Sequence, residues 1–322
     1  TTNAPITISG ADLGLGAILG SVAVSAQVVE PPVHVVGPVG TTFHTAATRL
    51  KLDLDLVDAG LDLSSLETAL LGPLGVLLGP VADINASATV GHLSLYVEVA
   101  SGDGALSLIN ATSNAVTLQG TPGVADVFIG DVSDALFFNR ATAITAADIT
   151  PATVGDLAIV VDGPLGVNII DASTGLAVKA LALGQAPLAD SLIYNGPFPQ
   201  TQTFGSSATF LTNLLDTLMT NLEVTITGTL GGTLDGLLDG VILPTLTPIV
   251  TTAVSPVLSD VLSGLVDPAL NSLGVGIGEM DARVAPLMPA VPPQANADFV
   301  QTNEGEEIVI SVLANDADAP AG

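Results

Sequence analysis

The chain has 322 residues, of which 48% are hydrophobic and only 11% charged, and its 32 acidic and 5 basic side chains give a formal net charge of −27. Five cations are too few to neutralise a row of phosphates, so this balance excludes nucleic acid as a partner and argues against an anionic membrane surface. Cysteine is absent, which excludes disulfides, thiolate metal sites and cysteine nucleophiles.

Residues 1–84 are predicted to be rich in strands and to contain one short helix. The stretch RLKLDLDL (49–56) alternates apolar and polar residues, as expected for a strand with one buried face. SSLETALLGPLGVLLG (64–79) offers a helix start, in which Ser64 or Ser65 is the cap and Glu67 completes a capping box. Pro73 and the neighbouring glycines are expected to limit that helix.

Residues 85–206 are predicted to form a β domain, because short β-branched runs alternate with the turn signals SGDG, TSN and TPG. In 207–283 the period becomes helical, and short Leu- and Val-rich helices punctuated by Pro are expected before a closing strand. The first of these helices places five leucines at helical spacing: Leu211, Leu214, Leu215, Leu218 and Leu222. A Pro-rich linker (284–294) leads to a β tail (295–322).

The predicted fold class is α+β, mainly β, with a β-sandwich-like body, a Leu-rich helical segment and an extended C-terminal β tail. The apolar stretch 240–266 contains three prolines and Asp260, so no transmembrane span is predicted. The first residues, TTNAPITISG, show no cleavable signal peptide and no initial Met, as expected of a processed N-terminus or a fragment. The apolar surface is therefore assigned partly to protein–protein contact.

The tail ANADFVQTNEGEEIVISVLANDADAPAG resembles the first strands of bacterial tandem Ig-like and cadherin-like repeats. The matching positions are Ala297, Asp298, Thr302, Glu304, Ile308, Ile310, Val312, Leu313, Asn315, Asp316 and Asp318. This resemblance covers less than a tenth of the chain. It implies a place in the extracellular stalk of an adhesin-type protein, with calcium at domain junctions.

The body resembles, more loosely, the C-terminal region of TadG-like proteins of bacterial tight-adherence pilus systems. The similar stretches are LSLYVEVASGDGALSLI (93–109), VTLQGTPGVADVFIGDVSD (116–134) and LVDPALNSLGVGIGEMDARV (265–284). The family often has cysteines and a membrane anchor, and neither is visible here. The resemblance implies the cell envelope or surface and brings no catalytic residues.

Three histidines, His34, His44 and His92, could be drawn into metal or catalytic sites, but isolated surface or core histidines are the commoner case. A Ser-His-Asp triad is compatible with the composition, yet no G-x-S-x-G elbow occurs. We therefore expect a protein that is not an enzyme.

Acidic clusters are the remaining chemical signal. Calcium takes several oxygen ligands, and the resemblance and the oxygen chemistry agree on four residues of the tail: Asp298, Asn315, Asp316 and Asp318. Asp53 and Asp55, which share one face of a strand, are the second candidates. The alternative for this pair is a solvated acidic strand face.

The function expected from these features is that of a non-enzymatic structural protein, extracellular or on a bacterial cell surface. It would be an adhesin segment or the self-assembling subunit of a fibre, joined when the tail adds as a donor strand to a neighbouring subunit. Homo-oligomers or polymers are the expected partners, with a surface receptor or glycan as a further one. The alternatives are an envelope assembly factor of a tight-adherence system and a carboxylate-based glycan hydrolase.

Overall fold

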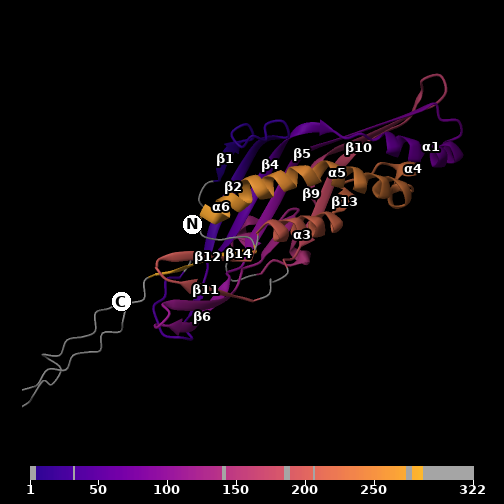
Figure 1. Ribbon diagram of the computed structural model, residues 1–322. Helices are drawn as coiled ribbons and strands as arrows, with labels where there is room; N and C mark the ends of the chain where they lie inside the picture. The colour runs from indigo at the N-terminus through magenta and orange to yellow at the C-terminus, as the bar shows by residue number, and fades with distance from the viewer. Residues whose placement is uncertain are drawn as a thin grey trace, which may run out of the picture.

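The computed structural model describes residues 5–31, 33–139, 143–184, 189–205, 207–272 and 278–285. Within these ranges it contains an eight-stranded sheet, a four-stranded sheet, a two-stranded sheet and several helices. The molecule is elongated: the large sheet and its helices form most of it, and the two smaller sheets lie at one end (Figure 1).

The large sheet is open and antiparallel at each of its ladders. Its strand order is β1-β2-β4-β5-β8-β10-β13, and β9 shares the space between β5 and β10 with β8. The strands are β1 (Ile6–Ser9), β2 (Leu19–Glu30), β4 (Ala47–Gly60), β5 (Asp83–Val99), β8 (Ala125–Ile129), β9 (Ala152–Asp162), β10 (Asn168–Ala182) and β13 (Glu223–Ile226). The strand expected at 49–56 is confirmed as part of β4.

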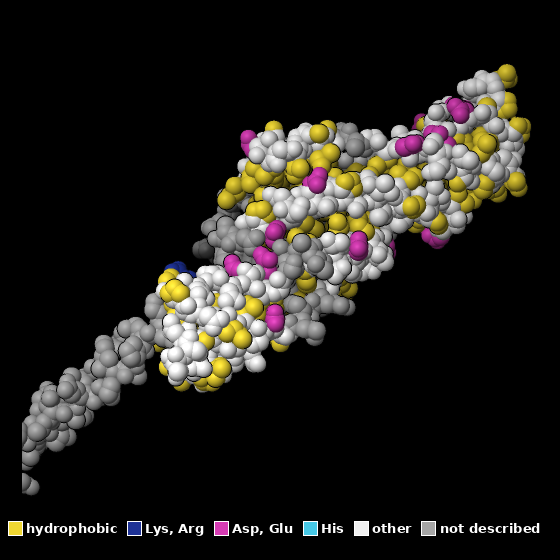
Figure 2. All heavy atoms as spheres, viewed as in Figure 1, with side chains coloured by type: hydrophobic (Ala, Val, Ile, Leu, Met, Phe, Trp, Pro, Cys, Tyr) yellow, Lys and Arg dark blue, Asp and Glu magenta, His cyan; other side chains and the backbone are white. Residues whose placement is uncertain are grey.

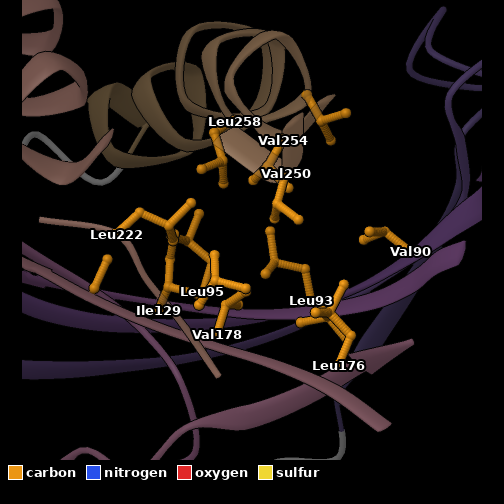
Figure 3. Close-up of a cluster of buried hydrophobic side chains, with 14 of the residues drawn as sticks. Val90, Leu93, Leu95, Ile129, Leu176, Val178, Leu222, Val250, Val254 and Leu258 are labelled. Carbon is orange, nitrogen blue, oxygen red and sulfur yellow. The ribbon is translucent and has the colours of Figure 1, made fainter. Parts of the chain in front are cut away.

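Helices cover one face of this sheet, and the core lies between the two layers (Figures 1 and 3). Leu93, Leu95 and Val178 of the strands face Val250, Val254 and Leu258 of α5, and all six side chains are buried. The alternation of β4 and β5 places their leucines on this face and their polar residues on the other. The helices are α1 (Ser64–Leu78), α3 (Ser207–Thr220), α4 (Gly232–Asp235), α5 (Leu243–Val261) and α6 (Asp267–Ser272), with short π-type turns η2 (Leu238–Ile242) and η3 (Leu262–Val266) on either side of α5.

The helical segment after residue 237 is more continuous than expected. Prolines were expected to divide it into short helices, but α5 runs through Pro248 and Pro256. Both prolines, like Pro244 before them, lie on the exposed face of the helix, where the carbonyl groups that lose their partner remain open to water. Burial of Leu246, Val250, Val254 and Leu258 on the opposite face stabilises the continuous run.

The stretch Leu238–Leu270 is also long and apolar enough to cross a membrane. In the fold it packs over the large sheet, with 33% of its most apolar window buried. A single helix of this kind is weak evidence for a membrane span and is consistent with the expectation of none. Helix α3 is confirmed as well, with Leu214 and Leu218 buried against the sheet, but it ends at Thr220, so Leu222 lies beyond the helix.

Helix α1 begins where expected but without the expected cap. The residue before it is Leu63, no side-chain cap is formed, and Pro73 lies inside the helix. Asp62 instead accepts a hydrogen bond from the backbone N–H of Ser64 (3.1 Å), which lowers the pKa of that carboxyl group. Glu67 accepts one from the N–H of Ala86 in β5 (2.9 Å), so this side chain ties the helix to the sheet and is not available for a capping box.

The smaller sheets pack face to face. One has the order β11-β7-β6-β3, and the other pairs β12 with β14. Tyr194 and Phe204, both fully buried, meet Val116 and Met280 between them, and the hydroxyl of Tyr194 donates to the carbonyl of Ala282 (2.9 Å). Their strands are β3 (Thr42–His44), β6 (Asp103–Asn110), β7 (Ala115–Thr121), β11 (Asp190–Asn195), β12 (Gln200–Gly205) and β14 (Glu279–Val284).

The expected class, α+β and mainly β, is confirmed by 45% strand and 27% helix. Face-to-face packing of sheets, as in a sandwich, belongs to the smaller unit, whereas the large sheet packs against helices. Strands from the predicted parts 1–84 and 85–206 interleave in the large sheet, since β4 pairs with β5. The predicted β tail, 295–322, lies outside the described residues.

Candidate functional site

The face of the large sheet opposite the helices carries a row of polar side chains on β4 and β5. The ladder sets Asp53 opposite Ser94 and Asp55 opposite His92. Further along the same face, Arg49 stands opposite Glu98 and Lys51 opposite Tyr96. On β4 and β5, this face therefore holds two of the four described Lys and Arg residues close to several carboxylates.

Hydrogen bonds connect this row across three strands. Ser21 of β2 donates to Asp55 Oδ2 (2.7 Å), and His92 Nδ1 lies 3.4 Å from Asp55 Oδ1. Ser94 donates to Asp53 Oδ1 (2.8 Å), and its Oγ lies 3.4 Å from His92 Nε2. The hydrogen bond from Ser21, with a smaller contribution from His92, lowers the pKa of Asp55.

Ser94, His92 and Asp55 have the order of a Ser-His-Asp triad, but the hydrogen bonds give them a different role. A nucleophilic serine passes its proton to the histidine, whereas the Ser94 hydroxyl donates to Asp53. The arrangement is best described as a polar network that joins β2, β4 and β5.

The same network bears on the predicted calcium ligands. Asp53 and Asp55 share a face, as expected, but Asp53 also lies near Lys51 (Nζ–Oδ2 3.5 Å) and Asp55 near His92. Among the described residues, no group of three or more His, Asp or Glu side chains could hold a metal ion. Asp298, Asn315, Asp316 and Asp318 lie outside the described residues, so calcium there stays a prediction.

Arg49 anchors the segment after β8 on this face. Its guanidinium is bound to Glu98 Oε1 (2.6 and 3.1 Å) and donates to the carbonyls of Phe137 and Asn139 (2.8 and 2.7 Å). Tyr96 and Phe137 stack edge to face beside it, with 4.9 Å between ring centroids. The side chain is 3% exposed, so we assign it to the structure of the fold and not to ligand binding.

A second surface feature is an apolar end, which we call the apolar tip. It combines the last turns of α1 with the hairpin between β9 and β10, and these lie together because Asp83, at the start of β5, pairs with Asp162, at the end of β9. Figure 2 shows hydrophobic side chains gathered at this end of the molecule, far from the smaller sheets. The exposed side chains that define the apolar tip are Leu71 (51%), Val76 (87%), Leu77 (59%), Leu165 (101%), Val167 (63%) and Ile169 (41%).

The apolar tip was not predicted from the sequence, although a signal exists. The pentapeptide GPLGV occurs twice, at 72–76 and 163–167, and the fold brings both copies to the same end of the molecule. One copy is the end of a helix and the other the turn of a hairpin, so the repeated letters do not reveal their proximity without the ladder between β5 and β9.

The last described strand, β14, supplies a third feature. It pairs with β12 to form a two-stranded sheet, with Met280 and Ala282 buried and Asp281 and Arg283 facing outward. Among the strands that the structure describes, only β12 pairs with β14, so the backbone groups on the other edge of β14 can pair with an added strand. The edge strands of the large sheet, β1 and β13, have only four residues each, against six in β14.

Comparison of the chain with protein-family models, with curated proteins and with solved structures gives no match. The three features above are therefore interpreted from their own geometry and chemistry.

Proposed function

We propose that the chain is a non-enzymatic structural module of a bacterial cell surface, an adhesin segment or the subunit of an extracellular fibre. The observation that carries this proposal is the outer edge of β14, at one end of an elongated body. Residues 307–315, EIVISVLAN, alternate as a strand does and follow β14 in the chain. Addition of this segment to the β14 edge of the next copy joins subunits head to tail, and a contact that does not close makes a filament.

The contacts within the polar network support a structural role of its side chains over a catalytic role. Its serine donates to a carboxylate, and its histidine and lysine each lie beside a carboxylate on the same face of the sheet. A glycan hydrolase needs two carboxyl groups on opposite sides of a bound sugar. Asp53 and Asp55 are on one strand and one face, which does not favour that alternative.

Assembly of the intact chain, followed by light scattering and negative-stain microscopy, tests the proposal. The intact protein is expected to form polymers, and a chain ending after Pro293 is expected to stay monomeric. Ile310→Pro, which removes a ladder hydrogen bond in the predicted donor strand, should also abolish polymers. Ala319→Pro, outside the predicted strand, is the matched control and should leave them intact.

Polymers of the truncated chain would refute donor-strand assembly. A monomer that needs detergent would instead support the alternative of an envelope assembly factor. Hydrolysis of polysaccharides by the intact chain, lost on an Asp→Asn substitution, would establish the enzymatic alternative.

A further inference from the structure

The apolar tip exposes positions that belong to the core elsewhere in the same helix. Leu70, Leu74 and Leu77 follow one another at spacings of four and three, so they share one face of α1. Leu70 and Leu74 are fully buried, but Leu77 is 59% exposed. Leu78 still packs against the core, so the last turn of α1 leaves only part of its apolar face, including Leu77, uncovered by the described residues.

The hairpin between β9 and β10 adds a leucine where the backbone favours another residue. Leu165 has φ +74° and its side chain is completely exposed. Left-handed backbone costs a residue that has a Cβ atom about 1–2 kcal/mol, and Gly or Asn is the usual choice. Leu165 makes no contact with the other described residues that would offset this cost, and an unfavourable residue of this kind points to a use outside the fold.

The shape of the apolar tip favours a lipid phase over a folded protein as its partner. The hairpin turn projects beyond the end of α1, and the hydrophobic side chains cover a convex end (Figures 1 and 2). A folded partner would need a matching cavity to receive the projecting Leu165 and the exposed Val76 of α1. A fluid apolar phase takes up such side chains without a preformed cavity, as lipid does with interfacial anchors.

The charged side chains around the apolar tip also limit which partners it can bind. The apolar tip is bordered by Asp83 and Asp162, and by Asp239 on η2, which packs against α1. The nearest Lys or Arg on β9 and β10 is Lys179, which is ten residues along β10 from Ile169. At the rise of a strand this separation is roughly 33 Å. The other described cations, Arg49, Lys51 and Arg283, belong to the polar face and to β14.

This charge distribution disfavours two occupants. A second copy docked tip to tip would bring two acidic borders together, and an anionic lipid surface would repel the border. A zwitterionic surface with choline headgroups presents its ammonium groups outermost, where they complement the carboxylates.

We infer that the apolar tip inserts into a zwitterionic lipid surface, with its Leu and Val side chains at the boundary between headgroups and acyl chains. Interfacial segments of this kind reach about 5–10 Å into the bilayer. The carboxylates of the border then lie among the headgroups. This surface is separate from the proposed assembly edge at β14, which lies at the other end of the molecule.

A single tryptophan reports insertion directly, because the chain contains none. Val76→Trp in the full chain is expected to shift its fluorescence emission to the blue when phosphatidylcholine vesicles are added. Leu108→Trp, at an exposed position (54%) of β6 in the smaller unit, is the matched control and should not shift. Absence of a shift at position 76, or an equal shift at 108, would overturn the inference.

Flotation of the full chain with vesicles gives the second measurement. Leu165→Asn suits the left-handed backbone and should not lower stability, but together with Val76→Ser it is expected to reduce the vesicle-bound fraction at least about tenfold. Leu108→Asn should bind as the original chain does. Tighter binding to vesicles that contain phosphatidylglycerol, or retention of binding by the double variant, would refute the inference.

Two further outcomes separate this inference from its alternatives. Flotation should be unaffected by Ile310→Pro, so loss of polymers and loss of vesicle binding are independent results. A dimer in the absence of vesicles that Leu165→Asn with Val76→Ser dissociates would show that a second copy, and not lipid, covers the apolar tip.

Discussion

Asp126 illustrates how this fold tolerates a carboxylate that is unfavourable at neutral pH. It stands directly opposite Glu98 in the β8–β5 ladder and accepts a hydrogen bond from the N–H of Gly184 (2.9 Å). Burial, and to a lesser degree the charge of Glu98, raise the pKa of Asp126, against the effect of that hydrogen bond. Since the folded pKa is raised, the free energy of unfolding falls as the pH rises above the unfolded value of about 3.9.

Asp126→Asn keeps an acceptor for Gly184 and removes the charge. We expect this variant to be more stable at pH 7, by a few tenths to about 1 kcal/mol after screening by solvent, and the difference to vanish near pH 3. Urea unfolding at both pH values measures it. Asp190→Asn, an exposed aspartate whose side chain accepts from Ser191, controls for the loss of one negative charge. Equal effects of the two substitutions would contradict the prediction.

Tyr194 joins the two smaller sheets through its hydroxyl group. Burial raises the pKa of this side chain to about 12, and the hydroxyl donates to Ala282. We expect Tyr194→Phe to lower the free energy of unfolding by about 1 kcal/mol at pH 7. Because unfolded tyrosine ionises near pH 10, the stability from this group is lost as the pH rises toward 12. The gap between the two proteins should therefore narrow at pH 11 in urea melts, and a constant gap would contradict this assignment.

At the scale of an element, glycine has opposite roles in β9 and α1. A Cβ on Gly155 would lie 1.8 Å from the carbonyl oxygen of Thr89, at the point where β5 passes from β9 to β8. Gly75 of α1 has no atom within 4 Å of such a Cβ. The close approach of Thr89 explains why residue 155 is a glycine. Gly75 lowers the stability of α1, and no contact at this position requires a glycine.

We therefore predict that Gly155→Ala lowers the melting temperature and that Gly75→Ala raises it. The first change forces β5 and β9 apart, with an expected cost of about 2–4 kcal/mol typical of overpacking and strain. The second gains about 0.5–1 kcal/mol from helix propensity. Thermal melts followed by circular dichroism compare the two. A neutral Gly155→Ala would show that this close approach is not required.

For the whole molecule, the excess of acid is the dominant electrostatic property. A net charge of −27 repels itself, so the folded state should gain stability when NaCl is raised from about 0.01 to about 0.15 M. The melting temperature is the measurement, and a fall with added salt would contradict it.

Calcium, if bound as proposed, should raise the melting temperature beyond NaCl at the same ionic strength, because a ligand of the folded state adds stability by mass action. Asp316→Asn with Asp318→Asn should remove this additional increase if the tail binds the ion. Asp53→Asn should remove it if β4 does. An unchanged melting curve after addition of a chelator would remove the calcium proposal.

The periodicity of the sequence determined the elements and which of their faces are buried. Alternation at 49–56 predicted the strand and the inward leucines of β4, and helical spacing predicted α3, because both patterns arise from local backbone geometry. The continuity of α5 was not predictable, since prolines break an isolated helix and only packing on the sheet decides that they are tolerated on the exposed face. The prediction of a capping box for α1 was wrong for a related reason. Glu67 accepts a hydrogen bond from the N–H of Ala86, which is 19 residues away in the chain.

By itself, then, the sequence determined the class of the fold, the absence of cysteine chemistry and the acidic surface, because composition and period are local properties. Only the tertiary structure decided which residues meet. It set Asp53 beside Ser94 and Lys51, and it brought the two GPLGV copies to one end. Such contacts depend on strand order and register, which bring together residues far apart in the chain. Strand order and register produce no pattern among residues that are only a few positions apart.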